Sequence, residues 1–402
     1  MKNIIISVLL LLSLLCSCST ANIEEGSKTD VDSSSKTEQS AEGEEDVLNV
    51  EETAEGFVTE VNTKSVRYLG RVYPNLVKTR DCFAYPSSGI EFTFEGTRLE
   101  ADIYTSSPTN IYKDQLRVAV YIDDFSEPYK ILSLEEYHTW YTLAEGLSDT
   151  THKAKIVRIN GYGHNHVAVS HIRTEKSGVR PSEKRELYIE FIGDSITAGH
   201  GIEGGEKNSA SVENSELTYA ALTAKHFDAD YSLIARSGVS LVYGYGGSKG
   251  DLATMYEKWD FYNGKSDVYW DFANNRADIV VINVGTNDYW AGVYGQADET
   301  AARNTFCDGY YDFLKLVREK QPNATIIACL GPMTYKLMEE IELAVSKMNE
   351  YDGDLNVYAL KLEPKNPAAS DGVGTENHPS VITNKKMSET LIKAMQKFAG
   401  LE

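Results

Sequence analysis

A serine that follows closely after an apolar run is the first candidate for chemistry in this sequence. The run Leu187–Ile192 is typical of a buried strand, and Gly193, Asp194 and Ser195 come directly after it. A strand that ends in a sharp turn presents a hydroxyl group at the carboxyl edge of a sheet. Because serine alone is a poor nucleophile, such a site also needs a general base and hydrogen-bond donors for an oxyanion.

Three further blocks contain groups of the required types. Gly238 lies shortly after the apolar run Tyr231–Ile234, and Asn287 follows the run Ile279–Val284. His378 lies near the end of the sequence, directly before a proline. A glycine lets the backbone approach a substrate closely, a neutral amide donates without changing the charge of the site, and histidine is the commonest general base. This set favours ester hydrolysis.

Together the four blocks resemble the SGNH (GDSL-type) hydrolases, whose name combines Ser, Gly, Asn and His. Those letters fall here on Ser195, Gly238, Asn287 and His378. The resemblance implies that Ser195 is the nucleophile and His378 the general base. It also implies an oxyanion hole that consists of the backbone N–H groups of Ser195 and Gly238 and the side-chain amide of Asn287.

The orienting acid is the role that the resemblance leaves open. In this family the carboxylate, when present, lies two residues before the histidine, and this sequence has Glu376 there in place of the usual Asp. Some members lack a working acid, and a backbone carbonyl orients the imidazole instead. We rank Glu376 first, a Ser–His dyad second, and Asp371 in the same loop third.

The elements that must position these residues alternate between apolar strands and helices from Leu187 onward. Strands are expected at Leu187–Ile192, Tyr231–Ala235, Ile279–Val284, Ala324–Leu330 and Leu355–Leu360, and helices at Glu216–Phe227, Glu299–Lys320, Tyr335–Tyr351 and Thr383–Phe398. Such a pattern favours a parallel sheet covered on both faces, with the active site beyond the carboxyl ends of the strands. We therefore predict a flavodoxin-like, three-layer α/β/α SGNH domain.

The preceding region has a period of two. Ile90, Phe92 and Phe94 alternate with polar residues, and similar runs recur between short turn segments. This pattern predicts an all-β jelly-roll or β-sandwich domain without helices. A polar junction at Pro181–Lys184 separates the two patterns, so we expect a β domain over residues 57–182 and the hydrolase domain over 183–402.

This order of domains resembles carbohydrate esterase family 2, in which a jelly roll precedes the SGNH domain. The blocks Val66–Arg71, Ser88–Phe92 and Trp270–Phe272 carry the resemblance, which extends over roughly Ser65–Gly400. It implies removal of acetyl groups from polysaccharides or sugars. Residues expected to contact such a substrate flank the catalytic blocks; they are Trp290, Tyr289, Trp270 and His200.

The N-terminal segment has the features of a lipoprotein signal peptide over residues 1–18. Lys2 precedes the apolar stretch Ile4–Leu15, and the following Cys16-Ser17-Cys18 resembles a bacterial lipobox with Cys18 as the lipidated residue. Residues 19–56 are rich in acidic and small polar residues, which predicts a disordered tether. The expected location is the bacterial cell envelope, with a membrane anchor.

The net charge of −21 argues against nucleic acid as a partner. The sequence predicts neither a metal site nor a cofactor, and it leaves the oligomeric state open. Two alternatives remain besides a carbohydrate O-acetyl esterase. One is an SGNH lipase or thioesterase, which would need a long apolar channel. The other is a non-catalytic carbohydrate-binding surface lipoprotein.

Overall fold

The computed structural model describes residues 48–77, 80–105, 116–161, 166–205, 210–260, 265–362 and 371–401. The predicted signal peptide, Cys18 and most of the predicted tether lie outside these residues. None of the helices in the described part of the chain combines the length and hydropathy that a bilayer span requires.

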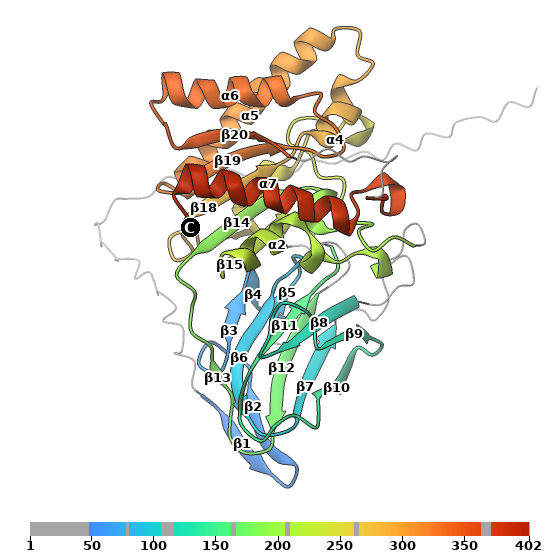
Figure 1. Ribbon diagram of the computed structural model, residues 1–402, viewed down its shortest axis with the longest axis vertical. Helices are drawn as coiled ribbons and strands as arrows, with labels where there is room; N and C mark the ends of the chain where they lie inside the picture. The colour runs from blue at the N-terminus through green and yellow to red at the C-terminus, as the bar shows by residue number, and fades with distance from the viewer. Residues whose placement is uncertain are drawn as a thin grey trace, which may run out of the picture. The chain divides into compact units, whose positions relative to one another are not determined.

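Two antiparallel sheets form the first domain and face each other across an apolar core (Figure 1). One sheet has the order β1-β2-β12-β5-β4 with β7 and β10 attached, and the other has the order β13-β6-β11-β8-β9 with β3 attached. Ile90, Phe92 and Phe94 of β6 are all buried in this core, as their alternation predicts. The strands are β1 (Val50–Thr53), β2 (Gly56–Glu60), β3 (Arg67–Leu69), β4 (Val72–Val77), β5 (Arg80–Phe83), β6 (Gly89–Glu95), β7 (Leu99–Thr105), β8 (Leu116–Ile122), β9 (Lys130–Leu134), β10 (His138–Ala144), β11 (Thr151–Arg158), β12 (Val167–Thr174) and β13 (Arg180–Pro181).

The start of this domain differs from the expected boundary. Val50–Thr53 form β1, which pairs with β2 in antiparallel register, so this part of the predicted tether is a strand of the sandwich. Its sequence, Val-Glu-Glu-Thr, contains a single large apolar residue, and Val50 is exposed at the sheet edge. Backbone pairing with β2 therefore defines this strand, and composition alone did not reveal it.

A five-stranded parallel sheet of order β15-β14-β18-β19-β20 forms the second domain (Figure 1). Its strands are β14 (Tyr188–Gly193), β15 (Asp230–Ala235), β18 (Ile279–Asn283), β19 (Thr325–Leu330) and β20 (Val357–Lys361). All four pairings are parallel. The predicted fold class, an N-terminal β domain followed by an α/β domain with a parallel sheet, is confirmed.

Helices pack on both faces of this sheet, as the apolar strands require. Buried residues of α2 and α7 form a core with one face, and those of α3, α5 and α6 form a core with the other. The predicted helix from Glu216 is divided: a short 3₁₀ turn ends at Leu217, and Thr218 caps the α-helix that begins at Tyr219. The helices and remaining elements are α1 (Ser195–Ala198), η1 (Ala210–Val212), η2 (Ser215–Leu217), α2 (Tyr219–His226), η3 (Tyr245–Gly247), α3 (Leu252–Glu257), β16 (Lys258–Asp260), β17 (Lys265–Tyr269), α4 (Thr286–Asp288), η4 (Tyr289–Val293), α5 (Glu299–Lys320), α6 (Met338–Tyr351), η5 (Thr375–Asn377) and α7 (Val381–Ala399).

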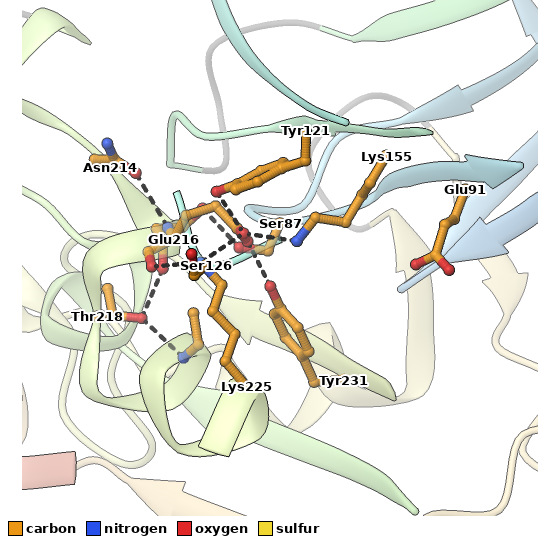
Figure 2. Close-up of polar contacts among 12 residues, drawn as sticks. Ser87, Glu91, Tyr121, Ser126, Lys155, Asn214, Glu216, Thr218, Lys225 and Tyr231 are labelled. Carbon is orange, nitrogen blue, oxygen red and sulfur yellow. Dashed lines mark hydrogen bonds and ion pairs between the residues drawn. The ribbon is translucent and has the colours of Figure 1, made fainter. Parts of the chain in front are cut away.

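Buried charges join the two domains. Glu216 of η2 pairs with Lys155 of β11 at 3.0 Å and with Lys225 of α2 at 3.3 Å (Figure 2). Its carboxylate also accepts hydrogen bonds from the hydroxyls of Tyr121 and Tyr231, one from each domain. Burial alone would raise the pKa of Glu216, but the two lysines outweigh it, so the pKa lies below its ordinary range.

Arg71, between β3 and β4, makes a second contact of this kind. It is fully buried, and its guanidinium lies 3.2 Å from the carboxylate of Glu190 in the middle of β14. The same guanidinium donates to the carbonyls of Tyr256 and Lys258 at 2.7 and 2.8 Å. An arginine of the β domain thus satisfies a carboxylate that belongs to a central strand of the parallel sheet.

Candidate active site

Ser195 lies at the carboxyl edge of the parallel sheet, on the first turn after β14. Asp194 caps α1 by accepting the backbone N–H of Ile196 at 2.9 Å, which fixes the turn that holds Ser195. The serine side chain is largely buried. This is the strand-to-turn geometry that the apolar run Leu187–Ile192 predicts.

His378 reaches this serine from a loop nearly two hundred residues further along the chain. Its Nε2 lies 2.8 Å from the Oγ of Ser195, and its Nδ1 lies 3.2 Å from the backbone carbonyl oxygen of Thr375. A carbonyl accepts only, so Nδ1 carries the proton and Nε2 is the acceptor that faces the serine hydroxyl. With the Thr375 carbonyl at Nδ1, Nε2 is in the tautomer that can accept a proton from Ser195.

The two candidate acids take up other contacts. The Oε2 of Glu376 lies 2.9 Å from the Nε2 of His200, and the Oδ2 of Asp371 lies 2.6 Å from the Nζ of Lys386. We ranked Glu376 first because it lies two residues before His378, but its side chain contacts His200 instead. Among the described contacts, the group that faces Nδ1 of His378 is the Thr375 carbonyl, as the second alternative, a Ser–His dyad, expects.

Gly238 and Asn287 come from the next two strand ends. Gly238 has φ +78°, and a Cβ atom there would have no heavy atom of the described part of the chain within 4 Å. The left-handed backbone, rather than crowding by protein atoms, therefore explains the glycine. Asn287 is buried; its Nδ2 donates to the carbonyl of Val239 at 2.8 Å, and its Oδ1 accepts from the Tyr245 hydroxyl at 3.0 Å.

These contacts fix the Asn287 amide with its NH₂ group toward the Gly238 loop. One of its two hydrogens is used on Val239, and the other is available to an oxyanion. Asp288 holds the same loop: its buried carboxylate accepts the backbone N–H groups of Leu241, Val242 and Tyr243. Burial raises the pKa of Asp288, and the three hydrogen bonds oppose that shift.

The four expected substrate contacts have different surroundings. Trp290 is half exposed and lies three residues after Asn287, where its ring packs against that of Tyr294 at 5.1 Å. Tyr289 is buried in the core, and the Trp270 ring packs on the Arg71 guanidinium at 5.1 Å. Of these three aromatic residues, Trp290 has the exposure that a sugar platform needs.

His200, the fourth, is placed between two carboxylates. Its Nδ1 lies 2.9 Å from Glu213 and its Nε2 2.9 Å from Glu376, and its ring meets that of His378 edge to face at 4.7 Å. Burial lowers the pKa of His200, but the two carboxylates outweigh it, so the pKa is raised. His200 therefore lies beside the His378 ring, and carboxylates contact both of its nitrogens.

Sequence reasoning did not assign roles to Thr375, Glu213 or Tyr294. A backbone carbonyl leaves no signal in the residue type, so the Thr375 contact cannot be read from sequence. Glu213 lies in a loop, and its separation in sequence from His200 and from His378 matches no known motif. The exposed Tyr294 could have been found, since it continues the aromatic segment that begins at Tyr289.

Two family profiles match this chain. Residues 191–363 match the GDSL-like lipase/acylhydrolase family, and residues 68–181 match the carbohydrate esterase 2 N-terminal domain. Cellulase/esterase CelE of Acetivibrio thermocellus is 34% identical over 230 residues, which are 55% of this chain and 26% of that protein. An acetylxylan esterase/glucomannan deacetylase of Cellvibrio japonicus is 26% identical over 54% of this chain and 61% of that protein. The chain thus spans only part of these curated relatives.

Solved structures extend the likeness to both domains. An active-site mutant of a family two carbohydrate esterase from Clostridium thermocellum has a TM-score of 0.74 at 27% identity, over 84% of this chain and all of that one. The same family's enzyme was also solved with cellohexaose, at a TM-score of 0.72. An acetyl xylan esterase from the rumen bacterium Butyrivibrio proteoclasticus, at 21% identity and TM-score 0.76, shows the same fold over 86% of this chain and 98% of that one. The chain thus combines a carbohydrate esterase 2 N-terminal domain with a GDSL-like lipase/acylhydrolase domain, and its homologues are carbohydrate esterase family 2 enzymes.

Proposed function

We propose that this protein is a serine esterase that removes O-acetyl groups from polysaccharides or oligosaccharides. The observation that carries the proposal is the 2.8 Å contact between Ser195 Oγ and His378 Nε2 at the carboxyl edge of the sheet. The names of the curated relatives, which include esterase and deacetylase activities on xylan and glucomannan, support a carbohydrate ester as substrate.

The first half of the reaction forms an acyl-enzyme. Ser195 Oγ attacks the acetyl carbonyl carbon while His378 Nε2 takes the hydroxyl proton. The carbonyl oxygen becomes an oxyanion, which accepts hydrogen bonds from the backbone N–H groups of Ser195 and Gly238 and from the Asn287 amide. The intermediate then collapses: the bond to the sugar oxygen breaks, and His378 returns the proton to that oxygen.

The second half releases acetate. His378 takes a proton from water, and the resulting hydroxide attacks the acetyl carbonyl of the acyl-enzyme. The same donors stabilise the second oxyanion, and the bond to Ser195 Oγ breaks as His378 returns the proton to it. The carbonyl of Thr375 keeps the imidazole in the required orientation and tautomer during both halves.

Aromatic side chains beside Asn287 support a sugar as the leaving group. Trp290, Tyr294 and Tyr245 are 51%, 61% and 56% exposed, although each has a large apolar ring. The apolar face of a pyranose can stack on such rings while its hydroxyls remain in water. We propose Trp290 as the main stacking residue, with Tyr294 packed behind it.

Acetate release tests the proposal directly. Wild-type protein should release acetate from 4-nitrophenyl acetate and from acetylated xylan or glucomannan. Ser195→Ala should lower kcat by about 10⁶-fold, as in other triad nucleophile variants, without unfolding the protein. Ser133→Ala, at an exposed position of β9, is the matched control. Substantial turnover by folded Ser195→Ala would reject the assignment.

The sequence also supports a membrane anchor, and we propose that Cys18 carries the lipid in the bacterial envelope. Cys18→Ser should move the protein from the membrane to the soluble fraction without changing its specific activity, and Cys16→Ser should not. The measurement is fractionation after labelling with a clickable palmitate analogue. Label that persists in Cys18→Ser would place the anchor elsewhere.

A further inference from the structure

The loop that carries His378 has a backbone that few side chains favour. Glu376 and Asn377, directly before the histidine, both lie in the left-handed region, with φ +56° and +63°. Two consecutive non-glycine residues keep a left-handed backbone only where surrounding contacts hold them in it. Such strained residues cluster at functional sites. The contacts of this loop therefore bear on how the base is positioned.

Those contacts lead from the loop into the β domain. The Oε2 of Glu376 lies 2.9 Å from one nitrogen of His200, and the Oε1 of Glu213 lies 2.9 Å from the other. The Oε2 of Glu213 accepts the backbone N–H of Gly161, which follows β11, at 2.9 Å. Glu213 is buried, so this chain of contacts is fixed at its inner end.

These contacts also fix the charge of His200. Both of its ring nitrogens face carboxylate oxygens, so both donate protons and the ring is an imidazolium. The His200 ring lies beside His378, 4.7 Å from its ring and edge to face.

We propose that Glu213, His200 and Glu376 are positioning residues that replace the acid of a catalytic triad. This inference rests on the proposed esterase function. The Thr375 carbonyl orients Nδ1 of His378, while Glu376, held by His200, keeps the strained loop in place. Held in this way, Nε2 of His378 stays 2.8 Å from the Ser195 hydroxyl, the distance from which it takes the serine proton.

A purely structural role of these three residues would affect the variants differently. In that case the cluster would only keep the protein folded, and its loss would lower the melting temperature together with the fraction of active molecules. The positioning role instead predicts a loss of kcat in fully folded protein. Among the described residues, the titratable groups in contact with His200 are Glu213, Glu376 and His378.

A double-mutant cycle tests the proposal. His200→Ala and Glu376→Ala should each lower kcat by about 10- to 100-fold through misplacement of the base, with KM changed less than about threefold. Because the two residues act through one contact, the double variant should be no worse than the lower single variant. Glu299→Ala, which breaks an exposed ion pair on α5, is the control and should leave kcat unchanged.

Glu376→Gln separates charge from hydrogen bonding. Gln still accepts a hydrogen bond from His200 but carries no charge, so it should recover part of the kcat that Ala loses. With the negative charge removed, the acid limb of the kcat/KM profile against pH should move to lower pH. A structural role would leave that limb in place.

The outcomes also separate this inference from the function on which it rests. Acetate release by wild type but not by Ser195→Ala establishes the esterase, whatever the cluster variants do. With that established, three results would each overturn the positioning role. These are single variants within about twofold of wild-type kcat, multiplicative losses in the double variant, or losses that match the unfolded fraction.

Discussion

At the scale of single residues, the site depends on side chains whose hydrogen bonds leave little freedom. Asn287 contacts Val239 through its NH₂ group and Tyr245 through its oxygen, so the amide cannot flip without losing both bonds. Asp194 and Asp288, which flank the key residues in sequence, hold backbone N–H groups. Donors fixed in this way need no reorganisation when the oxyanion forms, which is the condition for effective electrostatic catalysis.

Asn287→Ala should lower kcat by roughly 10²–10³-fold with a smaller change in KM, because it removes an oxyanion donor. Tyr245→Phe should cause a smaller loss in the same direction, since it frees the amide oxygen. Tyr243→Phe is the matched control, because that hydroxyl donates to the carbonyl of Ala302 on α5. Steady-state kinetics on 4-nitrophenyl acetate measures all three. A rise in KM at constant kcat for Asn287→Ala would make it a ground-state binding residue.

Asp194 predicts a pH dependence of stability. Burial raises its pKa to about 7, and the charge of Asp288 adds to this shift. Between about pH 4 and pH 7 the folded state then holds a proton that the unfolded chain has lost, so the free energy of unfolding falls as pH rises. Asp194→Asn keeps the acceptor for the Ile196 N–H and removes this dependence, which is worth about 1.4 kcal/mol per pKa unit.

Denaturant unfolding at several pH values between 4 and 7 measures the Asp194 effect. The curve of unfolding free energy against pH should be flatter for Asp194→Asn than for wild type. Asp312→Asn, at an exposed position of α5, serves as the control and should run parallel to wild type. Equal slopes for Asp194→Asn and wild type would show that the carboxyl titrates normally.

At the scale of elements, the strands were predictable and the direction of loop side chains was not. The apolar runs that precede Ser195, Gly238 and Asn287 identify three parallel strands, because strands buried on both faces have few other residue choices. The role assigned to Glu376 followed from spacing alone. Its left-handed backbone turns the side chain to His200, and the sequence gives no sign of that conformation at a glutamate.

The loops of Ser195 and His378 meet at Gly201. A Cβ atom there would lie 2.5 Å from the Thr375 carbonyl oxygen, whose residue also donates its N–H to the Gly201 carbonyl at 2.8 Å. Gly201→Ala should therefore push the two loops apart and lower kcat by about 10²-fold or more, as expected for misplacement near 1 Å.

Gly204→Ala gives a close control for Gly201→Ala. Both glycines have φ +70°, so both substitutions carry the same backbone strain, but a Cβ atom at Gly204 would meet no atom of the described residues within 4 Å. Melting temperatures of the two variants should fall by similar amounts, while kcat should fall only for Gly201→Ala. Equal losses of kcat would attribute the effect to strain in the Ser195 loop rather than to loop docking.

At the scale of the whole molecule, the β domain takes part in the architecture of the active site. Arg71 contacts the carboxylate of Glu190 in β14, and the backbone N–H of Gly161 binds the Glu213 end of the charged cluster. The sequence block Val66–Arg71 indicated the family, but only the structure shows that its arginine lies between the domains. The two domains therefore share buried polar contacts, each of which needs its partner.

The contribution of such an interdomain contact to stability can be measured at Glu216 (Figure 2). Glu216→Gln keeps the shape of the side chain but leaves Lys155, which is buried, without its counter-charge, so the protein should lose about 3–5 kcal/mol of unfolding free energy. Adding Lys155→Met should restore much of that loss, because no unpaired charge then remains buried. Lys225 can turn toward solvent, since its side chain is 21% exposed.

Denaturant unfolding measures both variants, with the exposed Glu319→Gln as the control that should stay within about 0.5 kcal/mol of wild type. A double variant less stable than Glu216→Gln would show that Lys155 contributes through its hydrogen bonds and packing at the domain boundary, not through its pairing with Glu216.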